Sequence, residues 1–128
     1  MPGTEAAKSH LSAIEVEIGM GIHNEPGHTR LSPIPPLSKL IEQLLELIMS
    51  TSDPERSFLP FKNDGSDEVV LLVNNLGGLS ELELSSIAGE TVKVLENKAK
   101  ILRVLVGSFM VRIILIMIIL TSSVIIYI

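Results

Sequence analysis

The sequence contains no cysteine and no tryptophan, and only 3% of its 128 residues are aromatic. The lack of cysteine excludes a disulfide framework, a thiolate nucleophile and cysteine-ligated zinc, and it fits a cytosolic origin. Acidic residues outnumber basic ones by 15 to 10, giving a formal net charge of −5. Because no basic cluster is interleaved with aromatics, nucleic acid is not an expected partner. The first 30 residues hold no long apolar run behind basic residues, so no signal peptide is predicted.

One of the three histidines lies on a glycine-rich turn that follows a predicted strand. Apolar residues and glutamates alternate up to Ile18, which is the period-two pattern of a half-buried strand over residues 15–18. The turn, residues 19–27, holds glycines that let a small ligand approach the backbone. His23 on this turn is either a nucleophile near neutral pH or a histidine that only hydrogen-bonds its own loop. No helical His-x-x-x-His pair accompanies it, so no metal site is predicted.

An amphipathic helix and a buried strand are expected next. Residues 30–36 form a proline-rich connector that cannot lie inside a sheet or helix. Leucines and isoleucines then recur at helical spacing along one face of residues 37–49. A polar loop leads to a continuous apolar run at residues 69–73, which indicates a buried strand, and a further strand is expected over residues 103–106.

A loop of asparagines and glycines, residues 74–78, joins that buried strand to a helix expected over residues 81–97. Ser80 and Glu83 have the spacing of a capping box. Free N–H groups where a strand ends and a helix begins favour anions and polar ligands. The loop is thus either a wall of a substrate or phosphate site, or a tight turn whose asparagines tolerate left-handed backbone. No Walker lysine follows Gly78, so the loop is not a P-loop.

Two of these segments together resemble the substrate-binding domain of dihydroxyacetone (glycerone) kinases, especially the fungal single-chain enzymes. That family carries G-x-G-I-H-x-E-P-G followed by D-E-V-x-L-L-V-N-N-L-G-G, which stand nearly intact at residues 19–27 and 67–78. The likeness covers about residues 2–110 and implies a partial α/β domain of the family's type with a mixed sheet. The site residues it implies are catalytic His23 and substrate-binding Gly21, Glu25, Asn74, Asn75, Gly77 and Gly78.

The resemblance also implies a chemistry. In the family the histidine of the first motif attacks the ketone carbon of dihydroxyacetone and holds the substrate as a hemiaminal, a role that falls to His23 here. Such a bond selects short ketones and aldehydes over glycerol, which has no carbonyl. ATP and magnesium are bound in the family by another domain, which nothing in this sequence resembles. No cofactor is therefore expected for this chain alone, and we expect the isolated chain to lack kinase activity.

The likeness stops after residue 110, within a nearly apolar run that begins at residue 104 and forms the tail. The tail over residues 104–128 is broken by Arg112, and only 16 residues follow that arginine. A bilayer span needs about 20 residues, so a membrane helix would have to include the arginine, and the candidate is about residues 104–126. Basic residues ahead of the tail would keep the preceding domain cytosolic. We expect an apolar helix over residues 111–128, with a β-prone, aggregating tail as the alternative.

The chain is accordingly divided into a partial substrate-binding domain, residues 1–110, and a divergent apolar tail, residues 111–128. We adopt a cytoplasmic dihydroxyacetone kinase fragment of glycerol and triose metabolism, because this function explains both motifs in order. Two alternatives stay open: a tail-anchored membrane protein with a non-catalytic α/β head, and a small α/β binding module. Dihydroxyacetone or another short ketone or aldehyde is the expected partner. Contact with a membrane through the tail and pairing with a second copy also stay open.

Overall fold

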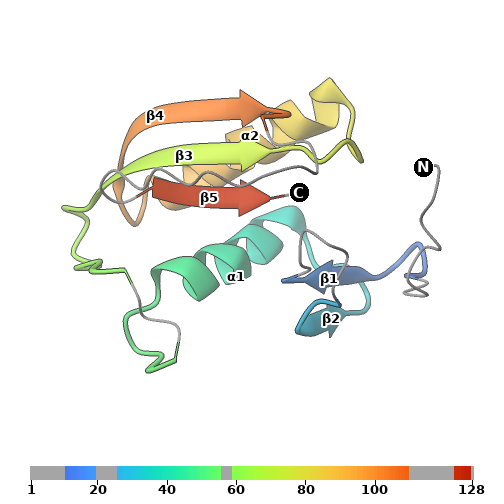
Figure 1. The fold of residues 1–128 in the computed structure, drawn as a ribbon, viewed down its shortest axis with the longest axis horizontal. Helices are drawn as coiled ribbons and strands as arrows, with labels where there is room; N and C mark the ends of the chain where they lie inside the picture. The colour runs from blue at the N-terminus through green and yellow to red at the C-terminus, as the bar shows by residue number, and fades with distance from the viewer. Residues whose placement is uncertain (1–10, 20–25, 56–58, 110–122, 128) are drawn as a thin grey trace. The chain divides into compact units, whose positions relative to one another are not determined.

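The computed structural model describes residues 11–19, 26–55, 59–109 and 123–127. The chain divides into two compact units, residues 1–36 and residues 37–128. In the described residues each unit has its own sheet, two-stranded in the first and three-stranded in the second. Figure 1 labels the helices and strands of both units.

The first unit contains an antiparallel strand pair. Strand β1 (Val16–Ile18) pairs with β2 (Thr29–Leu31), with Val16 opposite Leu31 and Ile18 opposite Thr29. The predicted strand over residues 15–18 is confirmed from its second residue onward. Strand β2 was not predicted, because its last two residues were assigned to the proline-rich connector. A strand of three residues is too short for its periodicity to be recognised, and it ends just before the first proline of that connector.

The second unit is a parallel sheet with β3 at its centre. Strands β3 (Glu68–Asn74), β4 (Lys100–Gly107) and β5 (Ser123–Tyr127) lie in the order β4-β3-β5, and both outer strands run parallel to β3. The predicted α/β class is confirmed. The predicted mixed sheet is not observed among the described residues. Their antiparallel pair forms one sheet and their parallel pairs form another. Strands β3 and β4 are parallel because a helix connects them.

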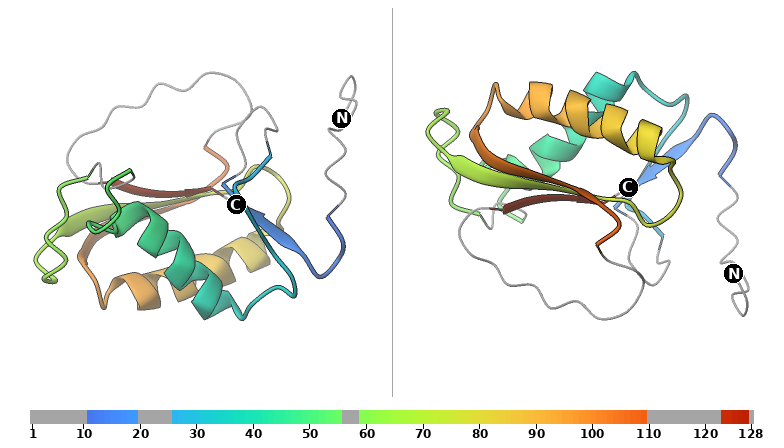
Figure 2. Two further views of the ribbon diagram at one scale, coloured as in Figure 1. Left: turned by 90° about the horizontal axis from the view of Figure 1, so that it is seen from below. Right: turned by 90° about the horizontal axis from the view of Figure 1, so that it is seen from above.

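Two helices cover one face of this sheet, as Figure 2 shows. Helix α1 (Leu37–Met49) matches its predicted range, and α2 (Glu81–Leu95) ends two residues before the predicted 81–97. Alternate residues of β3 and one face of each helix form the core, because strand side chains alternate and helix side chains repeat every three to four positions. The core positions are Ile41, Leu45, Met49, Val69, Leu71, Val73, Leu84, Ala88 and Leu95. Leu45 is fully buried, which contributes about 1.5–3 kcal/mol.

The expected apolar helix at the end of the chain is wrong where the structure describes it. Residues 123–127 of the expected helix form β5, which pairs with β3 from Val70 to Asn74. The candidate membrane span over about residues 104–126 begins inside β4, which confirms the strand predicted over residues 103–106. Among the described residues, no helix has the length and apolar character needed to cross a membrane. Isoleucine and valine favour strands because their side chains are branched at Cβ. Pairing with the neighbouring strand β3 therefore favours a strand over a helix for this apolar run.

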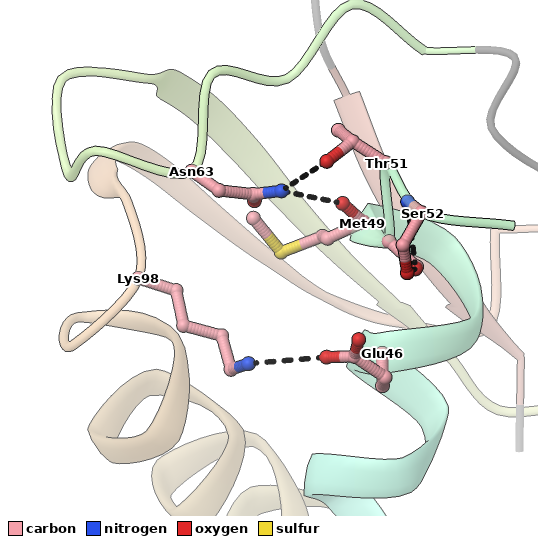
Figure 3. A network of polar contacts seen from close by, with 7 residues as sticks. Glu46, Met49, Thr51, Ser52, Asn63 and Lys98 are labelled. Atoms are coloured by element: carbon pink, nitrogen blue, oxygen red, sulfur yellow. Dashed lines mark hydrogen bonds and ion pairs between the residues drawn. The ribbon is translucent and has the colours of Figure 1, made fainter.

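The connection between α1 and β3 is fixed by the amide of Asn63 (Figure 3). Its Nδ2 donates to the carbonyl of Met49 at 3.3 Å and to the Thr51 hydroxyl at 3.2 Å. Asn63 has φ +56°, a left-handed conformation that asparagine tolerates better than most residues. The Asp67 carboxylate accepts from the backbone N–H of Asn63 at 2.9 Å. These contacts satisfy a terminal carbonyl of α1 and set the point where β3 begins.

Candidate functional site

The centre of the histidine loop lies outside the described residues, and with it lie the predicted site residues His23, Gly21 and Glu25. Both ends of the loop are described. Gly19 follows β1, while Gly27 and His28 precede β2. The backbone N–H of His28 donates to the carbonyl of Ile18 at 3.0 Å, so the two ends meet as the continuation of the strand pair.

Both terminal glycines of this loop are required by its geometry. Gly19 has φ +82°, and a Cβ on it would overlap the His28 imidazole. A Cβ on Gly27 would lie 2.5 Å from the Ile18 carbonyl oxygen and 2.6 Å from Cγ of Glu17. Backbone cannot move aside as a flexible side chain can, so only glycine fits at position 27. The glycines that bound the first motif therefore close the loop.

Glu17 is a positioning residue that the sequence analysis missed. Its carboxylate accepts from the backbone N–H of Gly27 at 2.9 Å and lies 3.8 Å from the Arg30 guanidinium. The Glu17 side chain is only 5% exposed. Strand alternation had placed it on the solvent side. The signal that it closes the loop was the pairing of an acidic residue before the motif with a basic residue after it.

The end of β3 and the loop that joins it to α2 hold four predicted site residues, and the side chain of Asn75 organises the loop. Asn75 Oδ1 accepts from the N–H of Gly77 at 2.8 Å and of Leu79 at 3.3 Å. Asn75 Nδ2 donates to the Leu79 carbonyl at 2.8 Å. The residue is 3% exposed. The Asn75 amide thus pairs with backbone N–H and C=O groups that a tight turn would leave without hydrogen-bond partners.

Asn74 joins the ends of two strands. It is fully buried at the last position of β3, and its Oδ1 accepts from the backbone N–H of Phe109 at 2.8 Å. The N–H of Asn75 donates to the carbonyl of Gly107 at 2.9 Å, which extends the pairing of β3 with β4 by one residue. The segment after β4 is therefore held beside the asparagine loop.

Gly77 and Gly78 leave the backbone of this loop accessible. Gly77 has φ +102°, which favours glycine, and a Cβ built on either residue would meet no atom within 4 Å. Both residues are exposed. The loop thus combines a backbone shape fixed from inside by Asn75 with an outer surface that a small polar ligand can reach.

The predicted capping box at the start of α2 is confirmed. The Ser80 hydroxyl accepts from the N–H of Glu83 at 3.4 Å, and the Glu83 carboxylate accepts from the N–H of Ser80 at 2.9 Å and from its hydroxyl at 2.7 Å. Hydrogen bonds from the Ser80 backbone and hydroxyl lower the pKa of Glu83 below its usual value. The box fixes the direction in which α2 leaves the loop.

Neither a cluster of metal ligands nor a P-loop is present in the part of the chain that the structure describes. Within this part, no three histidine, aspartate or glutamate side chains gather as metal ligands would. The residues after Gly78 are Leu79 and Ser80 rather than the lysine and serine or threonine of a P-loop.

Comparison with known proteins identifies the family. The model of the Dak1 domain matches residues 1–114. A dihydroxyacetone kinase of Komagataella pastoris is 50% identical over 97 residues, covering 74% of this chain and 16% of the relative. Dihydroxyacetone kinase 1 of Saccharomyces cerevisiae is 45% identical over 95 residues, 73% of this chain and 16% of the relative. A human triokinase/FMN cyclase is 42% identical over 111 residues, 86% of this chain and 18% of the relative.

No solved structure matches the chain. The chain spans about a sixth of the length of the curated relatives it matches. The family match extends through both motifs, the histidine loop and the asparagine loop. The described geometry accounts for the two glycines that bound the first motif and for the two asparagines of the second. The chain belongs to the Dak1 domain family.

Proposed function

We propose that this chain is the part of a dihydroxyacetone kinase that binds the acceptor substrate, with His23 as the covalent anchor. The observation that carries the proposal is the Dak1 match across the histidine motif, joined to a loop whose ends are closed by Glu17 and Gly27. A loop held at both ends loses less conformational entropy when it binds a substrate than a free one does. The relatives named dihydroxyacetone kinase supply the substrate class.

The proposed anchoring step is an addition without a leaving group. A ring nitrogen of neutral His23 attacks the ketone carbon, and the carbon–oxygen double bond becomes a single bond. The oxygen takes up one proton and the ring loses the proton from its other nitrogen, so the adduct has the mass of protein plus intact dihydroxyacetone. The step needs unprotonated imidazole, and we expect it to weaken as pH falls below the histidine pKa, ordinarily about 6.5.

The asparagine loop has a binding role in this proposal. The accessible backbone of Gly77 and Gly78 would contact the substrate, and the buried amides of Asn74 and Asn75 would hold that backbone in place. A backbone fixed before binding does not have to reorganise when it meets a hydroxyl group. Phosphoryl transfer requires a donor site as well, so we expect this chain to supply the acceptor half of the reaction.

A chimera tests the proposal without assuming that the chain works alone. The matched 97 residues of the Komagataella pastoris kinase are replaced by those of this chain, and ATP-dependent formation of dihydroxyacetone phosphate is measured. We expect activity in the chimera, at least a hundredfold loss with His23→Ala, following the usual contribution of covalent and acid–base groups, and little change with His10→Ala as the matched control. A His23→Ala chimera as active as its parent would refute the assignment.

A further inference from the structure

Two serines of the described chain stand before the same pattern of acidic residues. Ser52 is followed by Asp53 and, two residues later, by Glu55, and Ser80 is followed by glutamates at the same two positions. Carboxylates one and three residues after a serine form the pattern that acidophilic protein kinases bind through basic side chains. Both serines are exposed. The sequence and the exposure therefore do not distinguish the two serines as modification sites.

The hydrogen bonds of Ser80 protect it from modification. Ser80 is the N-cap of α2, where its hydroxyl donates to the Glu83 carboxylate at 2.7 Å and accepts from the Glu83 N–H at 3.4 Å. The residues that follow it form the first turn of α2, and Leu84 directly after them is fully buried. A protein kinase binds its substrate as an extended segment, so phosphorylation of Ser80 would require the capping box to open and this turn to unwind.

Ser52 lies instead in the exposed loop that follows α1 (Figure 3). Its hydroxyl lies 3.0 Å from the Ser50 hydroxyl, and the Asp53 carboxylate accepts from the N–H of Glu55 at 2.9 Å. Both contacts join residues two positions apart within the loop, so the segment can extend without unwinding a helix or strand. Ser50 also precedes an acidic residue by three positions, but its N–H donates to the Glu46 carbonyl at 2.9 Å, which continues the bonding pattern of α1.

We propose that Ser52 is a phosphorylation site for an acidophilic serine kinase. The Ser52 Oγ attacks the γ-phosphorus of ATP bound by that kinase, the bond from this phosphorus to the ADP oxygen breaks, and the hydroxyl proton passes to a base of the kinase. The chain gains one HPO3 group and ADP leaves. The carboxylates of Asp53 and Glu55 pair with basic side chains of the kinase and so position the hydroxyl.

A phosphate on Ser52 acts on the end of α1. It adds a charge of about −1.5 to −2 beside a helix C-terminus, which carries a partial negative charge, and the last turn of α1 has no basic residue to offset it. The adjacent Thr51 hydroxyl and the Met49 carbonyl both accept from the Asn63 amide, which fixes the connection to β3. The phosphate oxygens compete for this donor, so phosphorylation loosens the connection between α1 and β3.

The first test treats the full 128-residue chain with casein kinase II and ATP and locates the phosphate by mass spectrometry of proteolytic peptides. We expect phosphate on Ser52 and about tenfold less, or none, on Ser80. Glu55→Gln should slow the reaction about tenfold or more, because it removes a carboxylate that the kinase binds. Glu96→Gln is the matched control, since it removes the same charge from an exposed residue at the end of α2, and it should leave the rate unchanged.

The second test compares the phosphorylated chain with the untreated chain and so needs no variant. We expect a lower midpoint of urea unfolding, a difference that shrinks at high salt, and a changed NMR chemical shift of the Asn63 side-chain amide. Four results would each overturn the proposal: no phosphate on Ser52, as much phosphate on Ser50 or Ser80 as on Ser52, equal rates for the two glutamine variants, or an unchanged midpoint in the phosphorylated chain.

Discussion

Replacing Asn75 by alanine tests the interpretation that one buried amide holds the loop between β3 and α2. The change removes the acceptor for the N–H groups of Gly77 and Leu79 and the donor to the Leu79 carbonyl. Alanine is small enough to fit, so the loss arises from hydrogen bonding rather than from steric overlap. Asn75 is 3% exposed, so water cannot readily take the place of the lost hydrogen-bond partners.

The magnitude follows from the three contacts. Two of them are 2.8 Å long and one is 3.3 Å long. A typical hydrogen bond contributes about 1 kcal/mol net, and a buried group left without a partner costs about 1–3 kcal/mol. Because the loop can relax toward solvent on its exposed glycine side, we expect a loss of about 2–3 kcal/mol in the free energy of unfolding. Asn75→Asp keeps the acceptor but opposes a carboxylate to a carbonyl, so its loss should be similar or larger.

The measurement is urea unfolding followed by far-UV circular dichroism. Asn97→Ala is the matched control, because Asn97 is exposed and its amide makes a single bond of 3.0 Å to the Lys93 carbonyl. We expect the control to change stability by less than about 0.5 kcal/mol. If Asn75→Ala cost no more than Asn97→Ala, the loop would not depend on the Asn75 amide and the reasoning would be refuted.

Three further changes test other parts of the structure. Leu45→Ala should lower the free energy of unfolding by about 2–5 kcal/mol in urea titrations, because Leu45 is fully buried under the sheet. Gly27→Ala should abolish the close approach to Ile18, detected as loss of the NMR contacts between β1 and β2, whereas unchanged contacts would contradict the steric argument. The pKa of Glu83 is lowered in the folded state, so ionised Glu83 stabilises the fold at pH values above its unfolded pKa, and this stability is lost as pH falls through the folded pKa. Glu83→Gln cannot ionise at this position, so its thermal unfolding should depend less on pH below about 5 than that of the parent.

The sequence predicts the parts of the fold that local patterns determine. Helix α1 repeats its apolar residues at helical spacing over its whole length, and α2 carries a capping box whose two residues are read directly from the chain. The apolar run of β3 is bounded by Asp67 and by the asparagines, which are strand-ending residues. In each case the signal lies within the element itself.

The sequence does not predict what long-range pairing decides. The last described strand, β5, reads as an apolar helix because an isoleucine-rich run is compatible with both structures, and only the neighbouring β3 selects the strand. Strand β2 exists because β1 lies opposite it. Glu17 closes the histidine loop through a contact ten residues along the chain, which alternation cannot reveal.

The substrate-binding roles of Asn74 and Asn75 stay predictions, but their contacts are now defined. The sequence allowed either a wall of a substrate site or a tight turn. The structure shows side chains engaged with the loop and with the segment after β4, beside glycines whose backbone is accessible. The two interpretations are therefore compatible, because the asparagine side chains can hold the shape of the loop while the backbone of its glycines binds a ligand.

The covalent role of His23 is tested most directly by NMR on the chimera with the Komagataella pastoris kinase. The chimera is labelled with nitrogen-15 at its histidines and mixed with dihydroxyacetone labelled with carbon-13 at the ketone carbon. The account predicts that the ketone signal is replaced by a signal of a tetrahedral carbon coupled directly to a histidine nitrogen, and that His23→Ala removes it. A bound substrate that keeps its ketone carbon, or a coupled signal that survives His23→Ala, would contradict the account.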